Sequence, residues 1–292
     1  MEMDVKRVSQ VILSSCLLLF LIGCFPGHIT PRGKIVKVAI LPEYSLRFMS
    51  EKYTPLWDYL SEETGYRIEP VSAISYSVFL SALEGAKAHI SFQNGLFYSI
   101  LAKTKGAKPI VEALTEEGSD SSRGLIITRA DSPISAIADL KGKTIMVPSK
   151  RAVLGYLAQL VLCNQKGLNP EKDLTIVLGR RHDEVVFKVY GGKVDAGFVK
   201  EATLKTVANL VDISKIRILA RTEPFPNWCF TSFPQTDKEV VQKIKAALLK
   251  LNPNDPKHAA ILSGMGVGSF VEVSDKQYNS IRRAMDILRI PY

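Results

Sequence analysis

The chain has 292 residues, of which 46% are hydrophobic and 23% are charged. This composition excludes an intrinsically disordered chain, because it supplies enough apolar side chains for a packed core. At about 150 residues per domain, the length predicts one large domain or two ordinary ones. The formal net charge is +9. The basic residues are scattered along the predicted helices without interleaved aromatic residues, which favours a solvated surface and argues against a nucleic-acid partner.

The N-terminal segment has the pattern of a secretory leader. Basic residues precede an apolar run from Val11 to Ile22, which is shorter than the ~20 residues that a membrane span requires. The run ends in Leu-Ile-Gly-Cys, which resembles the lipobox of bacterial lipoproteins and predicts lipid attachment at Cys24; an ordinary signal peptide is the alternative. We therefore expect a lipoprotein signal peptide at 1–23, a tether at 24–34 and an extracytoplasmic protein anchored to a bacterial membrane by lipid.

Two cysteines remain in the part that we expect to fold, Cys163 and Cys229. An oxidising compartment would permit a disulfide between them, but two separate buried thiols are the simpler expectation. The sequence contains no Cys or His spacing typical of a metal site, and we expect no metal and no cofactor.

From Ile35 onward, the hydrophobic pattern alternates between short apolar runs, which predict strands, and longer amphipathic runs, which predict helices. This order predicts parallel sheets that are covered by helices on both faces. In the first part of the chain we predict strands at 35–41, 66–73, 89–93 and 109–114, and helices at 50–65, 76–86 and 95–105.

A polar loop at 115–122 then marks a boundary between two lobes, and the alternation resumes after it. The predicted division gives lobe 1 residues 35–125 and 231–292, and gives lobe 2, with the crossings, residues 126–230. In the second part we predict strands at 124–130, 144–148, 174–179, 194–199 and 216–221, and helices at 131–142, 152–167, 183–192, 201–210, 237–251, 256–264 and 274–289.

The stretch from Ala130 to Tyr156 contains the strongest local signal for a binding site. Its loop Pro148–Arg151 joins a predicted strand to a helix that begins near Ala152. A helix N-terminus at the end of a strand presents free N–H groups and the positive end of the helix dipole, which suit an oxyanion. Most corners of this kind bind nothing, and that alternative stays open on geometry alone.

Three segments in register carry a resemblance to a known family. They are Tyr53-Thr-Pro-Leu-Trp-Asp-Tyr-Leu-Ser-Glu-Glu-Thr-Gly65, the run from Asp131 to Ile145, and the run from Arg181 to Val199 with its Gly-Lys-Val-Asp-Ala-Gly. Together they resemble the phosphate/phosphite/phosphonate-type substrate-binding proteins of bacterial ABC importers, a branch of the type 2 periplasmic binding proteins. The resemblance extends from Ile35 to the C-terminus.

The resemblance implies an α/β fold of two lobes, each a mostly parallel sheet flanked by helices, which are joined by two extended crossings. It implies a monomeric solute-binding lipoprotein without enzymatic activity that captures a small oxyanion, phosphonate or phosphate-like, in a closing cleft and delivers it to an ABC permease. Matched to this sequence, it places ligand contacts at Tyr76, at Gln93 or Asn94, at His182 and close to Glu201. Ser149 and Arg151, in the loop before the helix start, are further candidate ligands.

One departure from the family pattern bears on the ligand. Where the family has a Ser-Thr-Ser run at the helix start, this chain has Ala152-Val153-Leu154, so three hydroxyl donors are missing. A less charged ligand is therefore one alternative, and a sensor subunit that hands its ligand-bound form to a signalling receptor is another. An enzyme on the same scaffold is a further class, but the chain lacks a Gly-rich phosphate loop, a nucleophile elbow and metal-ligand spacing.

Overall fold

The computed structural model describes residues 33–42, 46–84 and 87–291. The predicted signal peptide, Cys24 and nearly all of the predicted tether lie outside the described residues. Within these ranges, no helix is long and apolar enough to cross a bilayer.

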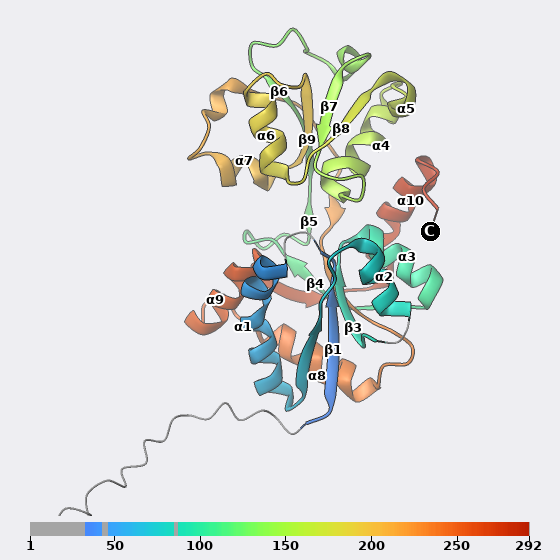
Figure 1. Ribbon diagram of the computed structural model, residues 1–292, viewed down its shortest axis with the longest axis vertical. Coiled ribbons are helices and arrows are strands. Elements are labelled where there is room, and N and C mark those ends of the chain that lie inside the picture. Colours follow the sequence, from blue (N-terminus) through green and yellow to red (C-terminus); the bar gives the residue numbers. More distant parts are fainter. Residues whose placement is uncertain (1–32, 43–45, 85–86, 292) are drawn as a thin grey trace, which may run out of the picture. The chain divides into compact units, whose positions relative to one another are not determined.

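The described chain forms two large sheets with flanking helices and one two-stranded sheet (Figure 1). The strands are β1 (Ile35–Ile40), β2 (Arg67–Val71), β3 (Ile90–Gln93), β4 (Lys108–Leu114), β5 (Ser121–Ser122), β6 (Gly124–Arg129), β7 (Thr144–Val147), β8 (Thr175–Leu178), β9 (Ala196–Lys200), β10 (Ile216–Arg221), β11 (Phe225–Pro226), β12 (Cys229–Ser232) and β13 (Ser269–Glu272). The α-helices are α1 (Leu46–Thr64), α2 (Tyr76–Glu84), α3 (Gly95–Lys105), α4 (Ala158–Gln165), α5 (Pro170–Asp173), α6 (His182–Tyr190), α7 (Ala202–Val207), α8 (Lys238–Lys250), α9 (Pro256–Met265) and α10 (Asn279–Ile287). A π-helix, η3 (Val153–Leu157), precedes α4, and 3₁₀ turns are η2 (Ile137–Leu140), η4 (Ile213–Lys215) and η5 (Asp275–Tyr278).

Lobe 1 is the six-stranded sheet, in the order β13-β4-β12-β3-β1-β2, together with the helices that pack on it. One face carries α1, α8 and α9, whose apolar residues form a large core with the strands. The other face carries α2 and α3. Because both faces are covered, strands such as β3 are buried along their whole length.

Lobe 2 is the five-stranded sheet, in the order β10-β6-β9-β7-β8, with its own helices. Helix α4 and the segment around η2 cover one face, and α6 and α7 cover the other. The short strands β5 and β11 pair antiparallel and run side by side between the two sheets. They form the two crossings between the lobes. The predicted boundaries at 125/126 and 230/231 are therefore a few residues off, because β6 already belongs to lobe 2 from Gly124 and β12 already belongs to lobe 1 from Cys229.

The two-lobe fold with helix-flanked, mostly parallel sheets is confirmed, and each sheet also contains antiparallel pairs. In lobe 1, β1 runs parallel to β2 and β3, whereas β12 is antiparallel to its neighbours β3 and β4. In lobe 2, β7 is parallel to β8 and β9, whereas β6 is antiparallel to β9 and β10. The physical reason is that β6 and β12 each enter their sheet directly from a crossing, so they arrive from the opposite end.

The predicted helix at 131–142 is wrong in its extent. Only Ile137–Leu140 is helical, as a 3₁₀ turn, because the Asp139 carboxylate accepts hydrogen bonds from the backbone N–H groups of Ser135 and Ala136 and closes a tight local loop. The apolar residues that suggested a helix are buried nonetheless, since Ile134 and Leu140 pack into the lobe 2 core.

Both cysteines of the folded part are free and buried. Cys163 lies in the lobe 2 core, and Cys229 lies in β12 of lobe 1 beside Tyr98 and Tyr278. Two separate thiols therefore agree with the simpler of the two expectations.

An apolar cluster connects the lobes, and we call it the bridging cluster. Helix α10 packs against both α3 of lobe 1 and α4 of lobe 2, and so it contacts both halves of the molecule. The buried residues of the bridging cluster are Leu96, Val153, Leu157, Ala158, Val161, Phe225, Ile281, Ala284 and Met285.

Candidate functional site

Tyr76 and Arg151 bring the two lobes into contact at the predicted site. Tyr76 is the first residue of α2, and its ring stacks on Phe97 of α3, with 5.4 Å between ring centroids and 11° between planes. The guanidinium carbon of Arg151, from the loop after β7, lies 4.5 Å from the centroid of the Tyr76 ring. A cation at this distance from an aromatic ring is attracted to it.

Asn94 makes a second contact with the same loop. It caps the N-terminus of α3, where its Oδ1 accepts a hydrogen bond from the Phe97 N–H at 3.2 Å. Its Nδ2 donates to the backbone oxygen of Arg151 at 3.3 Å. Within the loop, the Ser149 hydroxyl accepts from the Arg151 N–H at 3.1 Å. Four predicted site residues, Tyr76, Asn94, Ser149 and Arg151, are therefore brought together.

His182 is the first residue of α6, and a hydrogen bond fixes its tautomer. Its Nδ1 accepts from the backbone N–H of Lys200 at 3.0 Å, so the ring proton is on Nε2. Burial lowers the pKa of His182 to about 4, and the nearby positive charge of Lys200 adds to this effect. At neutral pH the ring is therefore uncharged, with Nε2–H as a donor.

The position of His182 is set by close packing against η3. A Cβ atom added at Gly155 would lie 2.6 Å from Cε1 of His182 and 2.6 Å from Cγ of Pro148. The ring thus lies directly against the backbone of the helix start that follows Ser149 and Arg151.

Two predicted residues do not join this group. Gln93 is fully buried in β3, where its Nε2 donates to Thr231 Oγ1 at 2.6 Å, while its Oε1 has no hydrogen-bond partner among the described residues. Glu201 lies at the start of α7, and its carboxylate accepts from Nε of Arg221 at 3.0 Å on an exposed surface. Of the neighbouring pair Gln93 and Asn94, it is Asn94 that contacts the lobe 2 loop.

The run Ala152-Val153-Leu154 is adjacent to the bridging cluster. Val153 is a buried member of that cluster, and Leu154 packs against it. The apolar side chains that stand where the family has hydroxyls therefore contribute to packing between the lobes. Ala152, at the N-cap position of η3, has no side-chain group that could cap the helix.

Sequence reasoning missed the role of Gln159. This fully buried residue donates from Nε2 to the backbone oxygens of Leu125, Val199 and Leu154, at 3.2, 3.1 and 2.9 Å. The bonds tie η3 to β6 and β9, next to the π-helical turn. A lone Gln inside the apolar run Leu-Ala-Gln-Leu-Val-Leu was the available signal.

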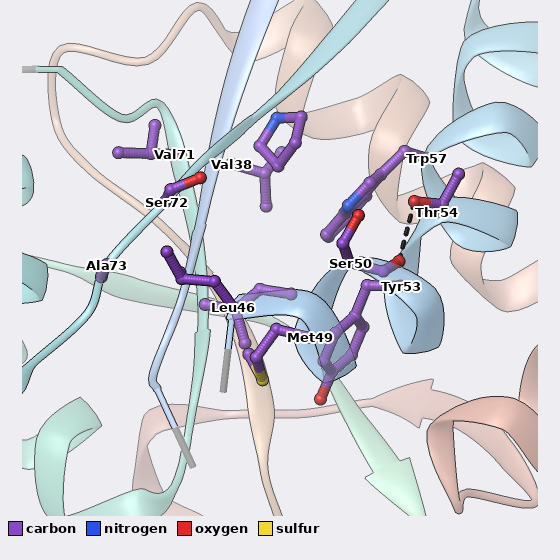
Figure 2. Close-up of a pocket in the computed structure, with 12 residues that line it drawn as sticks. Val38, Leu46, Met49, Ser50, Tyr53, Thr54, Trp57, Val71, Ser72 and Ala73 are labelled. Atoms are coloured by element: carbon purple, nitrogen blue, oxygen red, sulfur yellow. Dashed lines mark hydrogen bonds between the residues drawn. The ribbon is translucent and has the colours of Figure 1, made fainter. Parts of the chain in front are cut away.

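Sequence reasoning also missed a cavity of about 90 Å³ in lobe 1, at the carboxyl ends of β1 and β2 (Figure 2). Most of its lining is apolar, with hydroxyl groups at a few positions. The lining residues are Val38, Ile40, Leu46, Met49, Ser50, Tyr53, Thr54, Trp57, Pro70, Val71, Ser72 and Ala73. Among the described residues, no group of His, Cys, Asp and Glu is arranged to hold a metal ion.

Comparison with known proteins identifies relatives of the whole described chain. The phosphate-import protein PhnD of Mycolicibacterium smegmatis is 21% identical over 302 residues, which covers 94% of this chain and 94% of that protein. The solved structure of PhnD1 from Prochlorococcus marinus in complex with methylphosphonate superposes with a TM-score of 0.75 at 17% identity, covering 88% of this chain and 98% of that chain. At this identity the likeness shows the fold.

A second relative matches only part of this chain, at a higher sequence identity. The tetrathionate sensor histidine kinase TtrS of Salmonella typhimurium is 28% identical over 137 residues, which covers 42% of this chain and 23% of that protein.

The family model described as the periplasmic substrate-binding protein of ABC phosphonate transporters matches residues 38–278. Members of this family lie outside the cytoplasm, bind small ligands and work with an ABC permease. The match spans most of both lobes, including every residue of the site described above, and the chain therefore belongs to the phosphonate-type periplasmic substrate-binding proteins of ABC importers.

Proposed function

We propose that this protein captures a phosphonate- or phosphate-like oxyanion between its lobes, at the group formed by Tyr76, Asn94, Arg151 and His182. The observation that carries the proposal is the contact of Arg151, from lobe 2, with Tyr76 of lobe 1. A guanidinium offers several N–H donors in a planar fork that matches phosphonate oxygens, and so it supplies donors that the missing hydroxyls do not.

His182 adds a neutral donor to the same proposal. Its Nε2–H is free of the Lys200 hydrogen bond, which Nδ1 accepts. A neutral imidazole can donate one hydrogen bond to an anion at any pH well above about 4, where the ring stays uncharged. Relatives support the ligand class: one is named as a phosphate-import protein, and another was solved with methylphosphonate.

Calorimetric titration of the mature protein with phosphate, phosphite and methylphosphonate tests this proposal. A hydrogen bond to a charged group contributes about 1.5–3 kcal/mol, so Arg151→Ala should weaken binding by roughly 10- to 150-fold. Arg47→Ala is the matched control, because the Arg47 side chain is 90% exposed on α1 and pairs with Glu51. Equal affinities of the Arg151→Ala variant and the wild type would refute the assignment.

Closing of the lobes is part of the same proposal. Ligand contacts from both lobes favour a state in which the lobes approach each other, as in hinge-bending receptors. Small-angle scattering should show compaction when saturating ligand is added. A ligand that binds without compaction would exclude the hinge mechanism.

A second candidate is a sulfur oxyanion as ligand, with the protein acting as a sensor subunit. The local similarity to a tetrathionate sensor kinase favours it. Including tetrathionate in the titration distinguishes the two ligand classes. Adjacent permease and ATPase genes would support transport, whereas an adjacent sensor-kinase gene would support signalling.

We also propose that the protein is a monomer held at the membrane by lipid on Cys24. The motif Leu-Ile-Gly-Cys supports the anchor. In cells, Cys24→Ser should move the protein from the membrane fraction to the soluble fraction. Light scattering of the soluble form should give the mass of one chain.

A further inference from the structure

The end of lobe 1 at which its parallel strands begin carries many basic residues, and we call this end the basal edge. Strand β1 begins at Ile35 opposite Arg67 of β2, and β3 begins on the other side of β1. Strand β4 begins at Lys108, opposite Ser232, the last residue of β12. The basal edge is the lower end of lobe 1 in Figure 1, where β1 begins. Its basic residues are dispersed in the sequence, and they are Lys34, Lys37, Arg67, Lys87, Lys103, Lys105, Lys108, Lys238 and Lys243.

Two tertiary contacts hold several of these lysines close together. The first is a hydrogen bond, in which the Thr236 hydroxyl donates to the backbone oxygen of His89 at 2.7 Å. Lys87 lies two residues before His89, and Lys238 lies two residues after Thr236. This bond therefore brings the segments that carry the two lysines side by side.

The second contact adds the turn that precedes β4. A Cβ atom added at Gly106 would lie 3.1 Å from Cγ of Pro234, so the turn packs on the segment that leads from β12 to α8. Lys105 and Lys108 flank this turn. They therefore lie beside the segment that ends at Lys238, the first residue of α8.

Ion pairs neutralise only part of the charge on the basal edge. Two acidic residues of the edge, Glu62 and Glu84, lie outside any ion pair in the described chain. The ion pairs of the edge join Lys34 to Asp237, Arg67 to Glu69 and Lys243 to Glu239. Among the described residues, no carboxylate lies within ion-pair distance of four exposed lysines, which are Lys87, Lys105, Lys108 and Lys238. The balance of charge on the edge is therefore positive.

The titration of His89, which lies on this edge, agrees with a positive potential. Burial lowers the pKa of His89, and the positive charges of Lys34 and Lys37 lower it further. An exposed surface with an excess of positive charge attracts anionic partners.

The chain enters lobe 1 at the same edge. Gly33 is the first described residue, and its backbone packs against the backbone oxygen of Gly65, just beyond the end of α1. Cys24, the proposed site of lipid attachment, precedes Lys34 by ten residues, which span at most about 36 Å when fully extended. A lipid on Cys24 would therefore keep the basal edge within a few nanometres of the bilayer.

We infer that the basal edge of lobe 1 lies on the anionic phospholipid headgroups of the membrane that holds the protein. Its charge complements such a surface, and the end of the tether brings it there. The inference rests on the proposed anchor for this placement, whereas the charge of the edge is independent of the anchor. Tyr76 lies beyond the carboxyl end of β2, away from the basal edge, so the proposed binding site faces away from the bilayer and toward dissolved ligand.

Co-sedimentation with vesicles tests the inference. The Cys24→Ser chain carries no lipid, so it tests the edge apart from the anchor. It should partition onto vesicles that contain phosphatidylglycerol and not onto vesicles of phosphatidylcholine alone, and the partitioning should weaken as the salt concentration rises. Equal binding to the two kinds of vesicle would overturn the inference. Failure of the anchor itself would appear separately, as Cys24→Ser protein that stays in the membrane fraction of cells.

A pair of matched variants locates the contact. Each basic residue near an anionic surface adds about 5-fold to the partition coefficient, so neutralising three should lower it roughly 100-fold. The edge variant is Lys105→Gln/Lys108→Gln/Lys238→Gln. The control is Lys166→Gln/Lys188→Gln/Lys193→Gln, at exposed positions of lobe 2. Both variants lose three positive charges, but the control should bind like the parent chain. An equal loss in both would mean that binding follows net charge, and it would refute the edge.

Energy transfer in the lipid-anchored protein measures the orientation. A donor fluorophore is attached at Thr104→Cys, an exposed position on the basal edge, and acceptors are placed on the headgroups. The native cysteines Cys163 and Cys229 are buried, so the label goes to the new thiol. Transfer should decrease when the three edge lysines are neutralised and should stay constant in the lobe 2 control, because all three proteins have the same tether. Unchanged transfer in the edge variant would show that the tether alone sets the orientation, against the inference.

Discussion

Glu112 provides a quantitative test of the electrostatics at the crossings. It is fully buried in β4, where Oε1 accepts from the Asn227 N–H at 2.8 Å and Oε2 accepts from Gln277 Nε2 at 3.1 Å. Burial raises the pKa of Glu112 from 4.5 to about 7, and the negative charge of Asp120 contributes in the same direction. The folded state therefore holds this proton more tightly than the unfolded state does.

The sign and size of the effect follow by linkage. Stability from this group is fully present below pH 4.5 and is lost as the pH rises through about 7, because the folded state must then bury a charge. The difference between the two pKa values corresponds to about 3 kcal/mol. Glu112→Gln keeps the shape of the side chain but removes the titration. Relative to the wild type, its unfolding free energy should rise by up to about 3 kcal/mol between pH 5 and pH 8.

Urea denaturation at pH 5, 6, 7 and 8 measures this difference, and other titrating groups cancel between variant and wild type. Glu62→Gln, at an exposed position of α1, is the control and should show no such trend. A difference between Glu112→Gln and the wild type that stays constant over this pH range would refute the reasoning.

Two further substitutions test the packing around the helix start, and a third tests an exposed ion pair. Gly155→Ala should destabilise the protein by roughly 1–3 kcal/mol in urea denaturation and should weaken anion binding, because the added Cβ would displace His182. If the substitution instead stabilised the protein, as Gly→Ala usually does within a helix, the close packing would be contradicted. Gln159→Leu should lower the free energy of unfolding by about 1–3 kcal/mol, because three backbone oxygens lose a buried donor. An unchanged urea midpoint would show that these hydrogen bonds do not contribute to stability. Lys205→Ala breaks an exposed ion pair with Glu117 and should leave the thermal midpoint unchanged. A clear decrease would mean that this ion pair contributes more to stability than exposed ion pairs usually do.

The alternation of strands and helices was predictable because it follows from the local spacing of apolar residues. Predicted strands such as 35–41 and 216–221 appear as β1 and β10, within a residue of the expected bounds. The neighbours of each strand and their parallel or antiparallel pairing are not determined by local sequence. Strand β12 is inserted between β3 and β4, which precede it by more than a hundred residues, and no run of adjacent sequence encodes that neighbour relation.

The candidate site was predictable in part, through resemblance. Asn94 and Arg151 were expected near Tyr76, and the structure brings them into contact. Gln93 illustrates the limit. Its strand is covered on both faces and so shows no alternation of buried and exposed residues, and the sequence pattern therefore could not predict that the Gln93 side chain is buried in the core. The cavity could not be foreseen at all, since it forms only when α1 packs across the ends of β1 and β2.

The position of β12 has a consequence for how the chain matures. Lobe 2 is assembled from strands that follow one another between Gly124 and Arg221, whereas lobe 1 needs Cys229–Ser232 to fill the gap between β3 and β4. During synthesis, which proceeds from the N-terminus, the strands of lobe 1 therefore keep unpaired edges while lobe 2 completes its own sheet. The synthesis of lobe 1 begins first, but its sheet is completed after the sheet of lobe 2.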